Sequence, residues 1–522
     1  MLNSYDLDLN SLTSHVFVTG STGSGKSNTV YQLLRKAHKN GVKFLVVEPA
    51  KGEYKSVFGK KTDVHIYGTN PKQTKLLKLN PFRFDVKTTM LHEHIDRLIS
   101  IFNVCWPMYA AMPAVLKQAV EKSYADCGWD LANPWEENEY DNNYFPCFAD
   151  VARNVVEIIN SSDYDNENKG AYKGSLVTRL TSLTNGFFGM IFTSKDDIDK
   201  DELFDQNVIV DLSHVGSPET KSLIMGIIML KLQEYRMGSG KINSELNHLT
   251  VLEEAHNLLK RTSTDVSSES GNLQGRSVEM ISNAIAEMRT YGEGLIIADQ
   301  APGLLDMAAI RNTNTKIIMR LPDYDDRRLV GKAANLTDEQ IDELARLSIG
   351  VAAVYQNNWV QSVLCQMDKF ESDQDCSYEP DKQPLSEDLK QRGKCLEDLF
   401  RHKKIDTAIL NELYIADSLK ATILNYQKTY DDYPVTIGKI VTQLCPKGEK
   451  RLLQLIDSKV NASKWAAEVY NAILCYLNDT LEESIISKVI QSIMDSTITE
   501  GTVRDSVIRE WIDYKNSLTQ VK

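Results

Sequence analysis

Short, continuous apolar segments alternate with helical periodicity along the first part of the chain. The first apolar segment, residues 15–19, runs directly into a glycine-rich stretch, and a second follows at residues 44–47. Between them, apolar side chains recur at helical spacing, and Gly41 is placed to end that helix. The recurring side chains are Val30, Leu33, Leu34 and Ala37. Strands that are apolar throughout and alternate with helices indicate a parallel sheet covered on both faces.

The strand pattern pauses between about residues 81 and 205 and then returns. The pause is richer in helical periodicity, as at Leu91, Ile95 and Leu98, and predicts a largely helical insertion. Helical segments such as 221–235 and 278–291 separate most of the later strands. Those later strand segments are 208–211, 249–252, 295–298, 317–319 and 351–354. We therefore predict an α/β fold with a mostly parallel sheet.

A polar, acidic, proline-containing stretch, Asp368–Pro384, marks the expected domain boundary. Beyond it the chain is predicted to be almost entirely helical, as the spacing of Ile485, Val489 and Ile493 illustrates. The resulting division is an α/β core over residues 1–366, with the insertion at about 81–205, and an all-helical C-terminal domain over residues 367–522.

Composition narrows the class of protein without fixing its ligand. The chain of 522 residues carries a net charge of −13, which excludes a uniformly basic nucleic-acid coat but permits a local basic channel. Its eight cysteines are scattered and form no C-x-x-C pair, which argues against a zinc ribbon or a disulfide framework. No run of eighteen apolar residues and no signal peptide is evident, so we expect a cytoplasmic protein without a membrane segment.

The strongest motif is a phosphate-binding loop, because Gly20–Ser27 fits G-x-x-x-x-G-K-[ST] between a predicted strand and a predicted helix. Glycines allow backbone N–H groups to wrap a phosphate, and the following helix adds its positive N-terminal end. Lys26 is expected to reach the β- and γ-phosphates of ATP, and the Ser27 hydroxyl to ligate Mg²⁺. The nucleotide-binding residues are Gly20, Ser21, Thr22, Gly23, Ser24, Gly25, Lys26, Ser27 and Asn28. The predicted core is therefore a RecA-like P-loop NTPase.

Two adjacent acids follow the predicted strand at residues 249–252. Glu253 is expected to take the metal-shell position, where Asp is more usual, and Glu254 to act as general base. Gln300, at the end of the next strand, is a candidate sensor of the γ-phosphate or the attacking water; a polar strand terminus is the alternative.

Phosphoryl transfer also needs positive charge at the transition state, often from a neighbouring subunit's arginine. Arg289, near the end of the helix preceding residues 295–298, is the first candidate, and Arg320 is the second. Either arginine is equally consistent with a solvated surface position. No guanine-reading N-K-x-D motif is present, which disfavours a GTPase.

Together these motifs resemble those of HerA-like ATPases of the HerA/FtsK superfamily. The resemblance covers roughly residues 7–366 and five motifs in order. They are Gly20–Asn28, Glu48–Tyr54, Leu79–Phe82, Val251–Leu259 and Ala298–Gln300, with a further likeness from Arg311 to Leu321.

The resemblance implies a hexameric ring that holds ATP between subunits and translocates double-stranded DNA. By position, it assigns nucleotide and metal binding to Lys26 and Ser27, water activation to Glu254 and sensing to Gln300. Arg289 or Arg320 would act in trans, and Glu48 and Glu53 match an acidic motif near the nucleotide. Members of the family work with a nuclease or another effector enzyme, in DNA end processing or antiphage defence.

The sequence departs from the family pattern at its start, because the P-loop begins at Gly20 and the β-barrel that usually precedes it is not expected among the residues of this sequence; whether the protein naturally lacks this barrel stays open. Within the insertion, Lys169, Lys173 and Arg179 lie in or beside a glycine-flanked stretch that we interpret as a mobile basic loop able to contact DNA phosphates.

Three functions follow from this sequence. The leading hypothesis is an ATP-driven double-stranded DNA translocase or helicase that works as a homo-oligomeric ring with an effector such as a nuclease or NADase. The alternative is an ATP-gated scaffold that assembles and regulates a partner enzyme, with DNA movement incidental. A third is a motor for another polymer, as in secretion ATPases.

Overall fold

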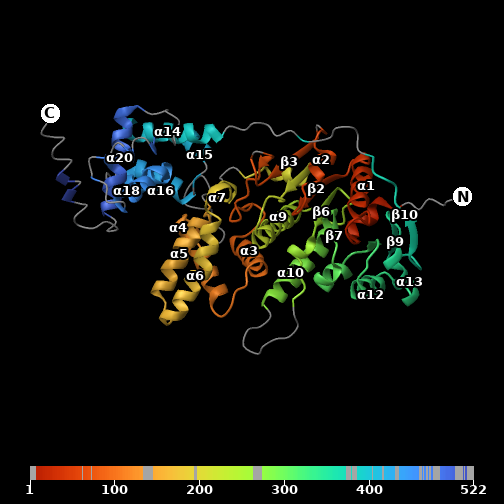
Figure 1. The fold of residues 1–522 in the computed structure, drawn as a ribbon. Helices are drawn as coiled ribbons and strands as arrows, with labels where there is room; N and C mark the ends of the chain where they lie inside the picture. Colours follow the sequence, from red (N-terminus) through yellow and green to blue (C-terminus); the bar gives the residue numbers. More distant parts are fainter. Residues whose placement is uncertain are drawn as a thin grey trace.

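A ten-stranded sheet organises the chain in the computed structural model (Figure 1). Described are residues 7–371 apart from 62, 72, 133–144, 193–196 and 263–272, together with residue 378 and, with further gaps, residues 385–513. The strand order is β10-β9-β8-β1-β7-β6-β2-β5-β3-β4. The strands are β1 (Val16–Thr19), β2 (Lys43–Glu48), β3 (Val64–Gly68), β4 (Lys75–Leu76), β5 (Asn207–Asp211), β6 (His248–Glu253), β7 (Glu293–Asp299), β8 (Thr315–Ile318), β9 (Val351–Gln356) and β10 (Val363–Gln366).

The pairing confirms the expected mostly parallel sheet. Only β9 and β10 run antiparallel to their neighbours, at one edge. In the middle, β1 pairs with β7 and β8, and β6 pairs with β2 and β7. The carboxyl ends of β1, β6 and β7 therefore meet at one edge of the sheet, which is where open parallel sheets bind ligands.

Helices cover both faces of the sheet. Successive side chains of β1 alternate between two apolar clusters, with Phe17 in one and Val16 and Val18 in the other. The first cluster includes α3 (Leu91–Cys105), α9 (Pro218–Gly238) and α10 (Leu273–Glu287); the second includes α1 (Lys26–Lys39) and α2 (Tyr54–Phe58). Two-sided burial explains why the strands are apolar throughout.

The insertion is helical, as predicted. After α3 it contains α4 (Met112–Asp126), α5 (Phe148–Ser161), α6 (Asn166–Ser182), α7 (Gly186–Phe192) and α8 (Lys200–Phe204). Figure 1 shows α4, α5 and α6 projecting together away from the sheet.

The proposed mobile basic loop is wrong, because Lys169, Lys173 and Arg179 all lie in α6. Asp165 caps this helix by accepting a hydrogen bond from the Asn168 backbone N–H (2.8 Å). Both lysines contact Asn160, and Arg179 forms an ion pair with Glu219 (3.5 Å). The two glycines in the stretch, Gly170 and Gly174, lie within the helix, although glycine is more often a sign of a loop.

The C-terminal residues form helices with an apolar cluster of their own. This cluster runs from Cys395 to Met494, and it adjoins the first of the two clusters that flank the sheet, because Ala421 belongs to that first cluster and Leu424 packs against both. Its principal helices are α14 (Leu385–His402), α15 (Thr407–Glu412), α16 (Asp417–Thr429), α17 (Pro434–Leu444), α18 (Pro446–Asp457) and α20 (Glu483–Thr499). The predicted boundary at residues 368–384 falls largely outside the described residues, so the domain division stays a prediction.

Further short elements connect the core, and they are η1 (Leu9–Ser14), η2 (Ala255–Asn257), η3 (Met288–Tyr291), η4 (Pro302–Leu304), α11 (Met307–Arg311), α12 (Tyr324–Ala333), α13 (Asp338–Glu343) and η5 (Leu344–Arg346). Among the helices described, none is long and apolar enough to cross a membrane.

A buried ionic cluster joins β6, β7 and α9 near the amino ends of the two strands. The fully buried Glu293 lies 2.9 Å from both Arg236 Nε and His248 Nδ1, and it accepts a hydrogen bond from Thr250 (2.7 Å). Burial alone would raise the pKa of Glu293, but His248 and Arg236 outweigh it and lower the pKa to about 2. The carboxylate is therefore charged in the folded chain.

We expect Glu293→Gln to destabilise the core by about 3 kcal/mol, because His248 and Arg236 lose a buried carboxylate, although Arg236 keeps its ion pair with Asp205 (2.6 Å). Because the folded-state pKa lies below the ordinary value, the stabilisation by Glu293 is present above about pH 4.5 and is lost as the pH falls towards 2. The difference in free energy of unfolding between wild type and Glu293→Gln should therefore become smaller as the pH falls over that range.

The measurement is the midpoint of urea unfolding, monitored by circular dichroism at a series of pH values between 7 and 3. Glu343→Gln, at an exposed position, is the matched control. A pH-independent gap would contradict the assigned charge on Glu293.

Candidate nucleotide-binding site

The glycine-rich loop connects β1 to α1 at the carboxyl edge of the sheet. Gly23 and Gly25 have left-handed backbone conformations (φ 75° and 108°), which other residues adopt only with strain. A Cβ on Gly20 would lie 2.5 Å from Ser24 Oγ, so glycine is also required there by space. The Ser24 hydroxyl is buried without a hydrogen-bond partner among the described residues. This is a tight backbone cradle of the kind that wraps phosphate.

Two neighbouring segments fix the loop from outside. The Arg320 carbonyl, just after β8, accepts a hydrogen bond from the Ser21 N–H (2.9 Å). The Gly350 N–H, just before β9, donates to the Ser24 carbonyl (2.9 Å). The loop is therefore held in shape by the strands on its far side, which favours a preformed site.

Lys26 lies between the two predicted acids. Its Nζ is 2.8 Å from Glu253 Oε2 and 3.6 Å from Glu254 Oε1, and all three side chains are at most 15% exposed. Burial alone would lower the pKa of Lys26, but Glu253 and Glu254 outweigh it and raise the pKa. The lysine is thus a buried cation held by carboxylates at the place where a phosphate is expected.

Glu254 and Gln300 are linked to the glycine-rich loop by hydrogen bonds. Gln300 Nε2 donates to Glu254 Oε1 (2.7 Å), and the Thr22 hydroxyl donates to Gln300 Oε1 (2.8 Å). Glu254 itself has a left-handed backbone (φ 46°, ψ 51°), unusual for glutamate, which turns the chain sharply after β6. A Gln in contact with both the loop and the predicted base is placed to respond to the nucleotide.

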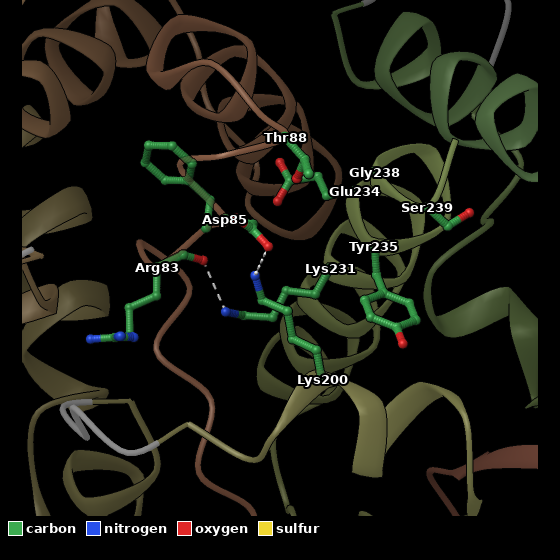
Figure 2. A pocket seen from close by; sticks show the side chains of 10 residues that line it. Arg83, Asp85, Thr88, Lys200, Lys231, Glu234, Tyr235, Gly238 and Ser239 are labelled. Atoms are coloured by element: carbon green, nitrogen blue, oxygen red, sulfur yellow. Dashed lines mark hydrogen bonds and ion pairs between the residues drawn. The ribbon is translucent and has the colours of Figure 1, made fainter. Parts of the chain in front are cut away.

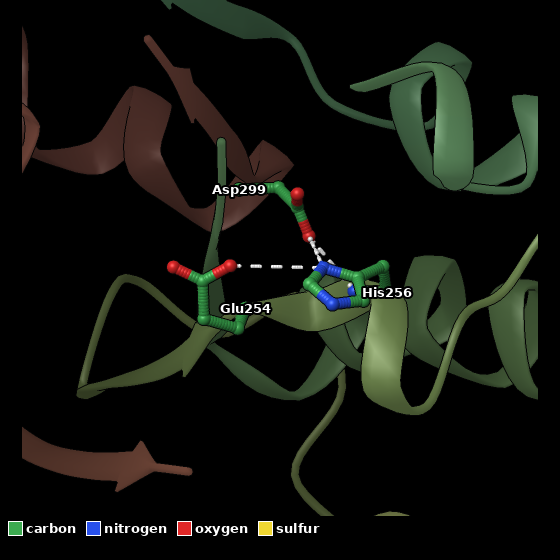
Figure 3. Close-up of side chains that lie close together, drawn as sticks. All are labelled: Glu254, His256 and Asp299. Atoms are coloured by element: carbon green, nitrogen blue, oxygen red, sulfur yellow. Dashed lines mark hydrogen bonds and ion pairs between the residues drawn. The ribbon is translucent and has the colours of Figure 1, made fainter. Parts of the chain in front are cut away.

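Sequence reasoning gave no role to His256 or Asp299. The buried Asp299 accepts a hydrogen bond from the His256 backbone N–H (2.8 Å) and contacts the ring Nδ1 (2.9 Å), while Glu254 Oε2 lies 3.7 Å from that nitrogen (Figure 3). The hydrogen bond to Asp299 raises the pKa of His256. Both residues are close to predicted site residues in the sequence, since Asp299 precedes Gln300 and His256 follows Glu253 and Glu254 after one intervening residue. Their contact with each other arises only in the fold.

The loop after β2 forms the opposite wall of the site. Glu48 accepts hydrogen bonds from the backbone N–H groups of Glu53 (2.7 Å) and Tyr54 (3.2 Å), and burial raises the pKa of Glu48 to about 8. Tyr54 donates its hydroxyl to Glu253 Oε1 (2.6 Å). The pocket between these elements is lined by Lys26, Ser27, Glu48, Ala50, Lys51, Glu53, Tyr54, Glu253, Glu254 and Gln300.

Three predicted site residues lie differently from the rest. The Asn28 side chain donates to the Asp368 carbonyl (2.9 Å) and accepts from the Phe370 N–H (2.6 Å), so it holds a later segment of the chain. Neither Arg289 nor Arg320 is among the pocket-lining residues. Arg289 is exposed in η3, and its charge acts on His15 just before β1, at the amino edge of the sheet. The action of Arg289 or Arg320 on the nucleotide of a neighbouring subunit stays a prediction.

The donor set fits Mg²⁺ and a nucleotide. Ser27 and Glu253 line the pocket together and offer hydroxyl and carboxylate oxygens, the ligand type that Mg²⁺ prefers. The open backbone of the glycine loop and the Lys26 cation suit phosphate groups.

A second pocket lies between residues 83–88, α8 and the end of α9 (Figure 2). Its cations already have partners. Lys231 contacts Asp197 (2.8 Å) and the Arg83 carbonyl (3.0 Å), and Lys200 lies 3.6 Å from Asp85. Burial also lowers the pKa of Lys200. We therefore place the nucleotide at the glycine-rich loop.

A glycine-rich cradle after β1, a lysine at the start of α1 and acids after β6 define a P-loop NTPase with a RecA-like sheet. Comparison with known proteins supports this class. Residues 4–232 match the family described as "Helicase HerA, central domain". The VirB4 structure of Thermoanaerobacter pseudethanolicus has a similar fold, with a TM-score of 0.50, 16% identity and coverage of 68% of this chain and 90% of that one.

Relatives by sequence confirm the resemblance to HerA-like ATPases. The DNA double-strand break repair helicases HerA of Sulfurisphaera tokodaii and Sulfolobus acidocaldarius are 25% and 26% identical over 368 and 371 residues. Each alignment covers 70% of this chain and 66% of the relative. The chain is thus related to the HerA-like ATPases and spans about two thirds of the length of these relatives.

We predict that Lys26→Met removes nucleotide binding and also destabilises the core by about 3 kcal/mol, because two largely buried carboxylates lose their cation. Lys26→Met combined with Glu253→Gln should recover part of that stability without restoring binding. Urea unfolding midpoints and titration with a fluorescent ATP analogue measure the two effects. Strictly additive destabilisation would contradict a direct Lys26–Glu253 interaction.

Proposed function

We propose that the chain is a Mg²⁺-dependent ATPase that moves double-stranded DNA. The observation that carries the proposal is the single constellation of Lys26, Glu253, Glu254 and Gln300 beside the glycine-rich loop. It contains the groups that phosphoryl transfer to water requires: a phosphate-binding cation, a metal-shell acid, a base and a polar sensor.

The mechanism follows from what these side chains contact. Phosphate oxygens replace Glu253 and Glu254 as the partners of Lys26, which frees both carboxylates. Glu254, oriented by Gln300, accepts a proton from the attacking water. Ser27 and Glu253 would hold Mg²⁺, which neutralises charge on the phosphates when bound. Gln300, bonded to Thr22 of the loop, relays the state of the nucleotide.

The DNA substrate is inferred from the relatives, two of which are named DNA double-strand break repair helicases. With a net charge of −13, the chain must contact phosphates through local groups of cations. Lys169 is one candidate for such a contact; it lies half-buried on helix α6, and its Nζ contacts the Asn160 carbonyl (3.2 Å).

The motor is proposed to be a homo-oligomeric, hexameric ring in the cytoplasm. In such a ring Arg289 or Arg320 would reach a neighbouring subunit's nucleotide. The exposure of Arg289 and its distance from its own pocket suit action in trans. Arg320 is tied by its carbonyl to its own loop.

An effector enzyme, such as a nuclease or NADase, completes the proposal, in antiphage defence or DNA end processing. The C-terminal apolar cluster, whose members run from Cys395 to Met494, favours the alternative function, an ATP-gated scaffold, because a helical unit with a core of its own suits docking of a partner.

We expect Glu254→Gln to keep ATP binding and to lower the rate of ATP hydrolysis at least about 100-fold. The amide of glutamine has nearly the shape of the carboxylate but cannot accept the proton of the attacking water. Single-turnover phosphate release and equilibrium binding of a fluorescent ATP analogue measure the two properties. Glu343→Gln is an exposed control in the same chain. Hydrolysis by Glu254→Gln at the wild-type rate would rule out the assigned base.

Two measurements test the ring and the action on DNA. The first is the ATPase rate as a function of protein concentration, with and without linear double-stranded DNA, and the second is the mass of the native assembly. A motor with sites between subunits predicts a rate per chain that rises with concentration, increases with DNA and accompanies a ring-sized mass. Arg289→Ala and Arg320→Ala, each mixed with Glu254→Gln, then identify which arginine completes a neighbour's site. A concentration-dependent rate that ignores DNA would instead favour the scaffold.

A further inference from the structure

The Tyr54 hydroxyl contacts the predicted metal-shell acid directly. Tyr54 begins α2, is only 2% exposed and donates to Glu253 Oε1 at 2.6 Å. Burial, reinforced by the charge of Glu253, raises the pKa of Tyr54 well above its ordinary value. In this contact the hydroxyl is the donor, because an ionised carboxylate can only accept a hydrogen bond.

The two carboxylate oxygens of Glu253 have different partners. Oε1 accepts from Tyr54, while Oε2 contacts Lys26 at 2.8 Å. When Lys26 turns to a phosphate, Oε2 loses its partner and Oε1 keeps its own. The geometry thus leaves one oxygen free on a carboxylate whose orientation is still fixed.

Tyr54 is itself held by an aromatic cluster, defined as Tyr31, Tyr54, Phe58 and Phe370. The Tyr31 ring packs edge-on against Tyr54 (4.9 Å between centroids) and against Phe370 (5.5 Å). Edge-to-face pairs of this kind add to the energy of burial and fix ring orientation.

Polar contacts from α1 secure the Phe370 end of the cluster. Asn28 bonds to both Asp368 and Phe370, and Gln32 donates to the Asp368 carbonyl (3.2 Å). Arg35 lies over the Phe370 ring at 4.8 Å. A continuous series of contacts therefore runs from the segment after β10 to Glu253.

We propose that Tyr54 is a positioning residue, which orients Glu253 towards Mg²⁺ through its hydroxyl while the aromatic cluster keeps the tyrosine ring in place. The inference rests on the proposed nucleotide function and deepens it. It assigns a role to the tyrosine at the end of Glu48–Tyr54, separate from the acids of that segment. Partners that orient a metal ligand commonly contribute tenfold or more to metal affinity.

The test is Tyr54→Phe, which removes the hydroxyl and keeps the ring. Calorimetry measures the affinity of the full chain for a non-hydrolysable ATP analogue in Mg²⁺ and, separately, in EDTA. We expect the gain in affinity due to Mg²⁺ to fall at least about tenfold, with affinity in EDTA unchanged. Tyr31→Phe is the matched control, because its hydroxyl donates to Glu53 (3.4 Å).

A second measurement separates positioning from general loosening of the fold. In a Glu253→Gln background, Tyr54→Phe should change the Mg²⁺ dependence little further, since Tyr54 acts through Glu253. This background also replaces the charged carboxylate by an amide, so the double variant does not leave an oxygen of a buried anion without its hydrogen-bond donor.

The outcomes are distinct. Equal Mg²⁺ dependence in wild type, Tyr31→Phe and Tyr54→Phe would overturn the positioning role alone. Loss of affinity in EDTA as well, or an equal loss in the Glu253→Gln background, would also overturn it, because either shows an effect that does not pass through Glu253. A wild-type chain that gains nothing from Mg²⁺ would defeat the proposed function itself.

Discussion

The site depends on one buried ionic contact, between Lys26 at the start of α1 and the two carboxylates at the end of β6, Glu253 and Glu254. A buried ammonium needs compensating charge, since an uncompensated ion costs several kcal/mol. Glu253 and Glu254 supply that charge here, and a nucleotide phosphate can supply it in their place. The same contact therefore stabilises the chain without ligand and defines where the ligand enters. In the proposed function, phosphate would replace both acids as the partner of Lys26, and Glu254 would then be free to act as the base.

The sheet makes this contact possible. Strand β7 lies between β1 and β6, so residues far apart in sequence emerge together at one carboxyl edge. Gln300 follows the central strand and spans the gap by bonding to Thr22 on one side and Glu254 on the other. The loop after β2 closes the site from the side of β6 and brings Tyr54 to Glu253. Parallel order thus brings four of the five sequence motifs into one constellation, and only Leu79–Phe82 contributes no residue to the lining of this pocket.

Much of this could be predicted from the chain because it is encoded locally. The glycine spacing with Lys26 and Ser27, and the acids after an apolar run, carry their chemistry in adjacent residues. The contacts missed are those between distant segments: Asp299 with His256, Tyr54 with Glu253, and Asn28 with Phe370. The start of helix α6 was predicted as a loop because the segment is rich in glycine and polar residues, whereas Asp165 in fact caps a helix there. The edge strands β10 and β4 lacked a distinctive pattern, since edge strands are only partly buried. Strand β3 was also not predicted, although it is internal and mostly buried.

The most direct test of the account is a structure of the full chain with Mg²⁺ and a non-hydrolysable ATP analogue. The account predicts that Lys26 Nζ leaves Glu253 Oε2, now 2.8 Å away, and contacts phosphate oxygens, while Tyr54 stays on Oε1. Glu254 would then face the γ-phosphate with Gln300 still beside it. A nucleotide bound elsewhere, or Lys26 still paired with Glu253 beneath a bound phosphate, would contradict it.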